Sequence, residues 1–488
     1  MNSHPMTRLK LIAISFVLCV LTVGCAKYVP QPLSAPENVS ALEVRTLSGP
    51  ALKQFLESTL GHEITPWPPK SWDFQMLALA ACYYHPDLEV ARVHWEVTKA
   101  GIITAGEYPN PSIGFTPQVV TNSSPPWVFT STTDIPIVTA GKIGYRKAQA
   151  KRLAETARMS MVNTAWQVRS RVRSALLSLY AATQTEDILR EQRDVQEANV
   201  SLLEQRLANG EVSQPEVTLA HIALNQTRLS LHDAQQRMAE ARVGLAEALG
   251  LQVNALDGVN ISYGFLERTP SAKDLPSADM RRQSLVGRPD ILSTLQEYAA
   301  SESALQLEIA NQYPDIHITP GYEWDQGNNK WTVVGLALTL PVFNQNKGPI
   351  AEAEAKRTEA AARFNALQAQ VISQIDRAVA SYGAVVQRVE TAESIVAAQR
   401  KQLQSVQGML KAGAADQLAV LGSELELKSA ELGCLDAYVK LQEAFGLVED
   451  AVQRPLDSVG AVPAVPEKGP RTEGKEGPKS QKSVEGKR

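Results

Sequence analysis

One stretch of 18 residues recurs in similar form in this chain, and this duplication constrains the fold more than any other feature. "IPIVTAGKIGYRKAQAKR" occupies 135–152, and "LPVFNQNKGPIAEAEAKR" occupies 340–357, 205 positions later. "RLANGEV" from 206 likewise corresponds to "MLKAGAA" from 409, at an offset of 203. An offset of this size far exceeds a solenoid repeat and indicates a duplicated domain. We therefore predict two repeats, over 72–250 and 285–452, joined by a connector over 251–284.

Each repeat is predicted to contain a first helix, two strands, a very long helix, a turn and a last helix. The first repeat begins with a helix over about 72–106, and its long helix covers 142–208, a run without proline that would be about 100 Å long. The second long helix covers about 350–411. Apolar residues recur at spacings of 4 and 3, which is typical of coiled-coil packing: Met161, Ala165, Val168, Val172, Ala175 and Leu179, then Val371, Ile375, Ala378, Tyr382, Val385 and Val389. A plain coiled-coil dimer is the alternative.

Two turns end the long helices. Asn209-Gly210 and Ala412-Gly413 supply the glycine that favours the left-handed conformation after a helix. Helical patterns resume over 216–249 and 416–452, so each repeat should form an antiparallel hairpin with its tip at the same end of a rod.

Four short segments alternate between apolar and polar residues, over about 111–121, 126–137, 314–324 and 330–342. Their length and alternation are typical of strands in a transmembrane barrel, although a soluble sheet with one wet face alternates in the same way. In the last segment Leu336 and Leu338 are expected on one face and Trp331 on the other. Since proline cannot donate to a ladder, prolines should mark the junctions between helix and strand: Pro109 and Pro314 at the entries, Pro136 and Pro341 at the exits.

Four strands cannot close a barrel, and open edges do not survive in lipid. The chain is therefore predicted to form an oligomer. Three copies would supply twelve strands and twelve helical positions around one ring.

The amino terminus has the features of an export signal. Arg8 and Lys10 precede an apolar run over 11–24, and Cys25 follows. This arrangement resembles the lipobox of bacterial lipoproteins, which implies a signal peptide over 1–24 and a lipid on Cys25; ordinary cleavage beside a chance cysteine is the alternative. Residues 25–71 would then form an extended, lipid-anchored segment, and the Gly/Pro-rich, basic tail over 453–488 is predicted to be disordered.

Composition narrows the function classes. The chain has 488 residues with 48 basic and 52 acidic side chains, so nucleic-acid binding has no electrostatic support. No nucleophile, phosphate-loop or zinc motif is recognisable, so we predict no enzyme activity, no cofactor and no metal site. Cys82 and Cys434 lie within separate helical patterns and are predicted to be unpaired.

Together, the duplication, "YPNPSIGF" from 108, the two 18-residue copies and the two turns resemble the TolC-type outer-membrane efflux proteins over about 72–452. The resemblance implies a mainly α chain with transmembrane β-strands, forming a trimer in which a 12-strand barrel in the outer membrane continues as a 12-helix barrel in the periplasm. It also implies outer-membrane lipid, a periplasmic adaptor (membrane fusion) protein and an inner-membrane pump as partners, with Asn209, Gly210, Ala412 and Gly413 at the tips that meet them.

The implied function is an exit duct that conducts small molecules or metal ions out of the periplasm. Two alternatives stay open: the exit duct of a type I protein secretion system, and a periplasmic coiled-coil adaptor that never spans a membrane.

Members of the family often carry aspartates inside the narrow tip, at positions that read Ala419 and Gly422 here. Asp416 is the nearest acid, and three copies would place a ring of carboxylates that attracts cations. The alternative is that Asp416 caps the helix that follows it. Glu211 and Glu216 at the first tip are the other gate candidates.

Overall fold

The computed structural model describes residues 27–121, 124, 126–267, 275–325 and 328–456. The predicted signal peptide, Cys25 and nearly all of the predicted tail lie outside these ranges. Residues 27–44 belong to a unit of their own, whose helix α2 (Ala35–Glu43) begins after Ser34, the side chain of which accepts a hydrogen bond from the Glu37 amide. All further description concerns the second unit, from Arg45 onward.

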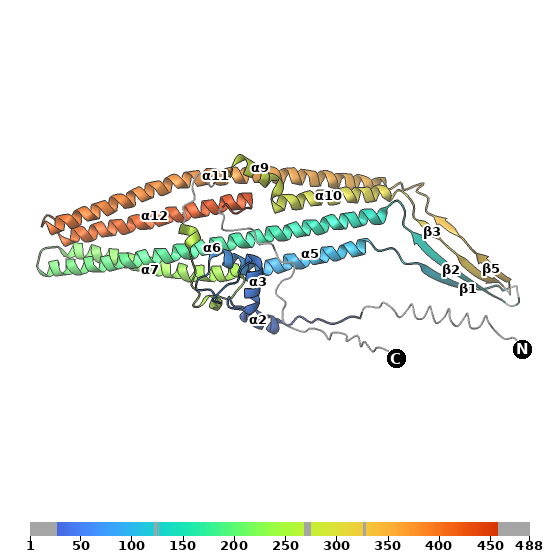
Figure 1. The fold of residues 1–488 in the computed structure, drawn as a ribbon, viewed down its shortest axis with the longest axis horizontal. Helices are drawn as coiled ribbons and strands as arrows, with labels where there is room; N and C mark the ends of the chain where they lie inside the picture. The colour runs from blue at the N-terminus through green and yellow to red at the C-terminus, as the bar shows by residue number, and fades with distance from the viewer. Residues whose placement is uncertain (1–26, 122–123, 125, 268–274, 326–327, 457–488) are drawn as a thin grey trace. The chain divides into compact units, whose positions relative to one another are not determined.

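The second unit is mostly helical, with strands at one end of its long helices (Figure 1). The part before the first long helix contains α3 (Pro50–Leu60), α4 (Phe74–Tyr84), α5 (Pro86–Ala105), β1 (Ser112–Val119) and β2 (Trp127–Ile137). The first hairpin and the connector contain α6 (Lys142–Ala208), α7 (Gln214–Leu249), η1 (Val253–Leu256), α8 (Gly264–Glu267) and α9 (Ala278–Gly287). The second repeat contains α10 (Pro289–Ala310), β3 (Ile316–Ile318), β4 (Gly321–Asp325), β5 (Asn328–Thr332), β6 (Leu336–Leu338), α11 (Lys347–Lys411) and α12 (Gln417–Val452).

The first helix of the first repeat is broken, so the prediction of one helix over 72–106 was wrong. α4 ends at Tyr84 and α5 begins at Pro86, where the missing amide of proline suits a first helical turn. His85 serves both helices: its amide donates to the carbonyl of Ala81 at 2.8 Å, and its Nδ1 accepts from the Asp87 amide at 3.2 Å.

The two very long helices are confirmed. α6 has 67 residues, and α11 has 65 and begins at Lys347, a few residues before the predicted start. The predicted seams are confirmed as well: Val168, Val172 and Val371 are fully buried, and the other predicted seam residues are buried or half-buried.

The helices form a layer in which the two repeats lie side by side. α6 packs against α7 and α5 of its own repeat and against α12 and α10 of the second repeat. α11 packs against α12 and α10. The order across the layer is therefore α7, α6, α12, α11 toward the tips and α5, α6, α10, α11 toward the strands, as can be followed in Figure 1. Among the long helices described, α7 and α5 form one outer edge and α11 forms the other.

Two apolar cores fill equivalent places in the two repeats. In the first, Trp72 and Leu77 pack with Val172 of α6 and Leu249 of α7. In the second, Ile375 and Tyr382 of α11 pack with Phe445 and Val448 of α12.

The strands form one antiparallel sheet. β1 pairs with β2, β2 pairs on its other side with both β3 and β4, and these pair with β6 and β5 respectively. The register places Phe115 opposite Ser131, and Ile135 opposite Ile318. The sheet thus has four strand positions in chain order, and in the described residues neither β1 nor the β5/β6 position is paired along its outer edge.

The third and fourth strands are each interrupted, which corrects the continuous strands predicted over 314–324 and 330–342. In the third, Pro320 has no amide to donate and separates β3 from β4. In the fourth, β5 and β6 are separated at 333–335, where Gly335 accepts a hydrogen bond from the Thr319 amide at 2.7 Å. A β-carbon at Gly335 would lie 2.6 Å from the Thr319 carbonyl oxygen, so only glycine allows this close approach.

The interruption also moves Trp331 to the other face of the sheet, so its predicted facing was wrong. Trp331 lies opposite Tyr322 in the register, and their rings are 4.5 Å apart. Leu336 lies opposite Ile318 on that same face. Because side chains alternate, residues 331 and 336 can share a face only if the strand gains an extra residue between them.

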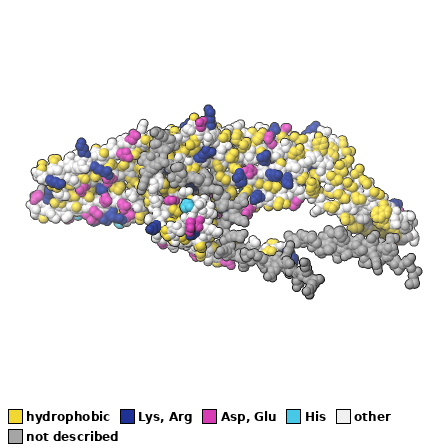
Figure 2. All heavy atoms as spheres, in the orientation of Figure 1, with side chains coloured by type: hydrophobic (Ala, Val, Ile, Leu, Met, Phe, Trp, Pro, Cys, Tyr) yellow, Lys and Arg dark blue, Asp and Glu magenta, His cyan; other side chains and the backbone are white. Residues whose placement is uncertain are grey.

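The sheet exposes much apolar surface. Figure 2 shows hydrophobic side chains gathered over the sheet and the neighbouring ends of the helices, whereas charged side chains are spread over the rest of the helical layer. The large exposed apolar residues of this region include Ile113, Phe115, Val119, Trp127, Phe129, Trp331, Leu336, Leu338, Leu340 and Phe343. An apolar surface of this extent on one region is typical of a surface that meets lipid or another chain.

Candidate functional site

The candidate site lies at the tips of the two helical hairpins. α6 ends at Ala208 and α11 at Lys411, and the glycines one residue beyond each helix cap, Gly210 and Gly413, have φ of 76° and 74°. Both turns therefore have the left-handed conformation that the sequence predicts, and α7 and α12 resume directly after them.

Asp416 joins the two tips. Its Oδ1 accepts a hydrogen bond from the Ala419 amide at 2.9 Å, which caps α12. Its Oδ2 lies 2.8 Å from Nη1 of Arg206 in α6. The Ala419 amide and the Arg206 guanidinium hold the pKa of this carboxyl below its usual range. The helix-cap role considered for Asp416 is therefore present, together with an ion pair between repeats that sequence reasoning missed.

The two glutamates at the first tip have local partners. Glu216 accepts a hydrogen bond from the Ser213 hydroxyl at 2.8 Å, at the start of α7. Glu211 lies 4.0 Å from Nε of Arg206. Neither arrangement tests a role in gating, so both residues stay candidates.

A second connection lies farther from the tips. Lys428 of α12 pairs with Glu191 of α6 and, at 3.0 Å, with Glu431 of its own helix. Arg400 of α11 lies 3.1 Å from the same Glu431. Partial burial would lower the pKa of the Lys428 ammonium, but the two carboxylates together raise it. Lys428 therefore stays protonated, and the network of two cations and two carboxylates links α6, α11 and α12.

A third connection is buried. Glu449 of α12 lies 3.5 Å from both Arg169 and Arg173 of α6, and all three are nearly inaccessible to solvent. Arg173 also donates to the carbonyl of Gln442 at 2.8 Å. A β-carbon at Gly446 would lie 2.3 Å from the Arg173 guanidinium, so the glycine makes room for it.

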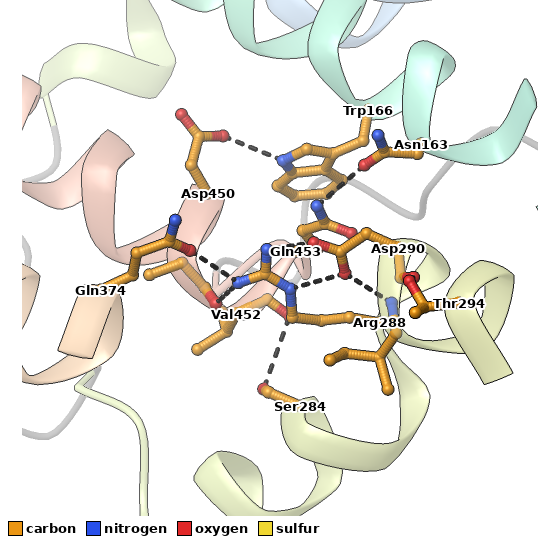
Figure 3. Close-up of polar contacts among 12 residues, drawn as sticks. Asn163, Trp166, Ser284, Arg288, Asp290, Thr294, Gln374, Asp450, Val452 and Gln453 are labelled. Atoms are coloured by element: carbon orange, nitrogen blue, oxygen red, sulfur yellow. Dashed lines mark hydrogen bonds and ion pairs between the residues drawn. The ribbon is translucent and has the colours of Figure 1, made fainter. Parts of the chain in front are cut away.

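The end of α12 meets the start of α10 beside this cluster (Figure 3). Arg288 lies 2.6 Å from Asp290, donates to a carbonyl oxygen near the end of α12 at 2.5 Å, and reaches Gln374 of α11 at 3.3 Å. On the α6 side, the Trp166 indole donates to Asp450 at 2.9 Å. The Arg288 contacts join α10, α11 and α12 within the second repeat, and the bond between Trp166 and Asp450 joins that repeat to the first at mid-length.

At the strand end, Lys142 fixes a junction between the repeats. Its ammonium lies 2.8 Å from Asp315, which also accepts from the Thr139 amide at 3.0 Å. Of the four predicted junction prolines, Pro109, Pro314 and Pro341 lie outside the strands, and Pro136 is the second-last residue of β2.

Cys82 and Cys434 are free, and burial raises the pKa of the Cys82 thiol to about 12. In the ranges that the structure describes, no group of three or more His, Cys, Asp or Glu side chains could hold a metal ion. None of the helices described there is both long enough and apolar enough to span a membrane.

The fold is that of known outer-membrane channels. The chain is similar in structure to the outer membrane protein VceC from Vibrio cholerae, with a TM-score of 0.63 and 19% identity, over 79% of this chain and 97% of that one. A sequence model of the outer membrane efflux protein family matches residues 80–251 and 280–446. The chain therefore belongs to the outer membrane efflux protein family, which confirms the resemblance to TolC-type channels.

Two curated relatives are similar over part of their length. The cobalt-zinc-cadmium resistance protein CzcC of Cupriavidus metallidurans is 25% identical over 263 residues, 54% of this chain and 61% of CzcC. The pyoverdine export outer membrane protein OpmQ of Pseudomonas aeruginosa is 26% identical over 184 residues, 36% of this chain and 38% of OpmQ. The match thus spans less than two thirds of either relative.

Proposed function

We propose that three copies of this chain form the exit duct of a tripartite efflux system in the bacterial outer membrane. The observation that carries the proposal is the pair of open edges. In the part of the chain that the structure describes, β1 and β5/β6 are unpaired on their outer sides, and α7/α5 and α11 are the outer edges of the helical layer. Both sets of edges lie on the same two sides of the chain, so a next copy can continue the sheet and the helical layer together.

Closure follows from the cost of unpaired strand edges in lipid. Four strand positions in each copy give twelve in three copies, enough for a barrel, and the exposed apolar residues of the sheet then face the membrane. The α5, α6, α10, α11 and α7, α6, α12, α11 orders give twelve helical positions along the duct. A coiled-coil adaptor that stays in the periplasm has no use for such a sheet, which disfavours that alternative.

The cargo we propose is a small molecule or a metal ion. CzcC is named for resistance to cobalt, zinc and cadmium, and OpmQ for pyoverdine export. The partners are a periplasmic adaptor protein and an inner-membrane pump, which meet the tips at Asn209, Gly210, Ala412 and Gly413. Cys25 carries the lipid that anchors the amino terminus in the outer membrane.

The gate lies at the tip, where the bond between Arg206 and Asp416 holds the two hairpins of one copy together. In the closed duct, three copies of Asp416 surround the axis, with Glu211 and Glu216 nearby.

Reconstitution in planar bilayers tests the duct. Each insertion of the full-length protein should raise the current by a step of the same size. Multivalent cations added on the tip side should block this current. Insertion without any conductance, at neutral pH and with the tip pair removed by Asp416→Asn, would contradict the proposal.

A further inference from the structure

A cavity of about 770 Å³ lies between α6, α11 and the end of α12. Its walls include Trp166 of α6, Gln374 of α11, and Asp450 and Gln453 at the end of α12, which can be followed in Figure 3. Ligand pockets for small organic molecules have volumes in this range. The cavity is therefore large enough for such a molecule, and the groups that line it decide which kind.

The cavity opens on the face of the helical layer opposite both apolar cores. Ser170 and Ser174 of α6 line it, and each lies two residues from Val172 of the first core, about 200° around the helix. Leu447 of α12 lines it and lies two residues beyond Phe445 of the second core. Residues of α4 and the connector contribute to those cores, so they cover the other face. The face without them is the one that can line a duct, because short helices packed inside would fill the lumen.

The lining of the cavity has one cation without a counter-charge. Arg171 pairs with Asp87 at 2.7 Å, and Arg288 pairs with Asp290 at 2.6 Å. Arg377 of α11 also lines the cavity and is exposed. It makes no hydrogen bond or ion pair with any residue that the structure describes. Arg377 is therefore available to an anion from outside the chain.

The acid in the described lining does not serve Arg377. Asp450 accepts from the Trp166 indole at 2.9 Å through one oxygen and from the Ser170 hydroxyl at 2.6 Å through the other. Ser174 of α6 and Ser381 of α11 are exposed at the cavity, and Ser381 follows the unpaired arginine by one helical turn. Hydrogen-bond donors therefore reach the cavity from both long helices, and the charge left to engage a ligand is positive.

The end of α12 supplies the remaining surface. Gln453 Nε2 donates to Asn163 at 2.9 Å, whereas its Oε1 is buried and has no partner in the described part of the chain. A buried acceptor without a donor costs stability, so a ligand hydroxyl or amide would be favoured beside it. Leu447, which is 56% exposed, and the buried Ala378 and Ala451 give the cavity an apolar area.

We propose that this cavity binds a small organic anion. Its anionic oxygens pair with Arg377 and accept from the hydroxyls of Ser174 and Ser381, and its apolar body packs on Leu447. The site lies within one copy, whereas its place on the inner wall rests on the proposed duct. Among the proposed cargo classes, the site favours organic anions over metal cations.

Binding of 2-naphthoate to the full-length protein in lipid nanodiscs tests the site by equilibrium dialysis at neutral pH. Empty nanodiscs correct for probe dissolved in lipid. Wild type should bind the probe saturably, at one molecule per chain. Arg377→Gln should weaken binding about tenfold or more, because a charge-assisted hydrogen bond is lost. Arg377→Lys keeps the charge and should weaken it less.

The matched control is Arg282→Gln, which removes an exposed arginine of α9, outside the lining of the cavity. It should bind 2-naphthoate as wild type does. 2-Naphthamide has the same apolar body without the charge and should bind far more weakly, and inorganic phosphate should displace the naphthoate poorly. Equal binding by wild type and Arg377→Gln, equal binding of the acid and the amide, or ready displacement by phosphate would each overturn the organic-anion site.

Current through planar bilayers separates the site from the duct. Naphthoate should lower the current of wild-type channels and leave that of Arg377→Gln unchanged. Arg377-dependent binding without any effect on the current would overturn the place of the site on the inner wall. Conducting channels that bind no naphthoate would overturn the site and leave the duct standing, whereas Arg377-dependent binding by a protein that never conducts would overturn the duct and leave the site.

Discussion

Arg206 and Asp416 belong to different repeats, and a 2.8 Å ion pair joins them at the hairpin tips. Because the same carboxylate caps α12, substitutions at this position affect two interactions. Asp416→Ala should remove both, with a loss of about 0.5–2 kcal/mol in helix stability from the cap alone. Asp416→Asn should retain the cap and remove only the charge.

If the charge gates the duct, Asp416→Asn should weaken block by multivalent cations added on the tip side and should leave block from the outer side unchanged. Arg206→Gln removes the ion pair and keeps the carboxylate, so it should not weaken the block. Unchanged cation block in the Asp416→Asn variant would leave Asp416 as a cap only. Bilayer recordings of the three proteins measure this.

The pH dependence of the tip pair follows from the lowered pKa of Asp416. A carboxyl whose pKa is lower in the folded protein adds stability above its unfolded pKa, about 3.9, and loses it as pH falls through the lower folded value. The stability that Asp416 contributes to the tip should therefore stay constant between pH 5 and 8. Conductance through wild-type channels should rise only near or below about pH 4. A rise near pH 6 in wild type would show that a group other than Asp416 controls the tip.

Glu449 should be far more sensitive to substitution than its exposed neighbours. Glu449→Ala leaves Arg169 and Arg173 buried without a counter-charge, and the expected cost is about 3–5 kcal/mol. Glu443→Ala, an exposed position on the same helix, should change stability by no more than about 0.5 kcal/mol. Denaturant midpoints followed by far-ultraviolet circular dichroism measure both, and equal midpoints would contradict the role assigned to the buried Glu449 and its two arginines.

Gly335 should tolerate no side chain. A β-carbon there would lie within 2.6 Å of Thr319 backbone oxygen, so Gly335→Ala should break the pairing of β3 with β6 at a cost of about 1–3 kcal/mol and reduce the yield of assembled protein. Gly383→Ala, in the interior of α11 with open space around it, should instead stabilise by about 0.5–1 kcal/mol. Wild-type yield and stability from Gly335→Ala would show that the sheet accommodates the change.

Cys25→Ser should abolish incorporation of labelled fatty acid and slow delivery to the outer membrane. Mass spectrometry of the mature amino terminus checks this prediction. A mature protein that begins elsewhere and carries no acyl chain would refute the lipid anchor.

Much of the helical architecture was predictable because the packing of the long helices requires apolar residues at regular spacings, which are visible in the sequence. Val168 and Val371 recur at a fixed offset on a coiled-coil period, and turns such as Asn209-Gly210 stop each run. The break at His85 was less visible, because Pro86 fits the first turn of one helix as well as the interruption of a longer one. The facing of Trp331 could not be predicted, since it depends on an extra residue between β5 and β6, where Gly335 pairs with Thr319 far away in the sequence.

The candidate site was predictable only in part. Asp416 stands out because it follows a glycine turn, and its local cap is encoded nearby. Its partner Arg206 is 210 positions away, and the pair exists only because the repeats lie side by side. Glu449 and its two arginines were missed for the same reason: a charge within a helical pattern has the same sequence signature whether it faces water or a buried partner.

The number of copies in the membrane-extracted protein tests the central claim most directly. Native mass spectrometry in detergent should give the mass of three chains, because only continued pairing of β1 with the next copy's β5/β6 satisfies the backbone in lipid. A uniform single-chain mass, in a protein that keeps its β signal in membranes, would contradict the account.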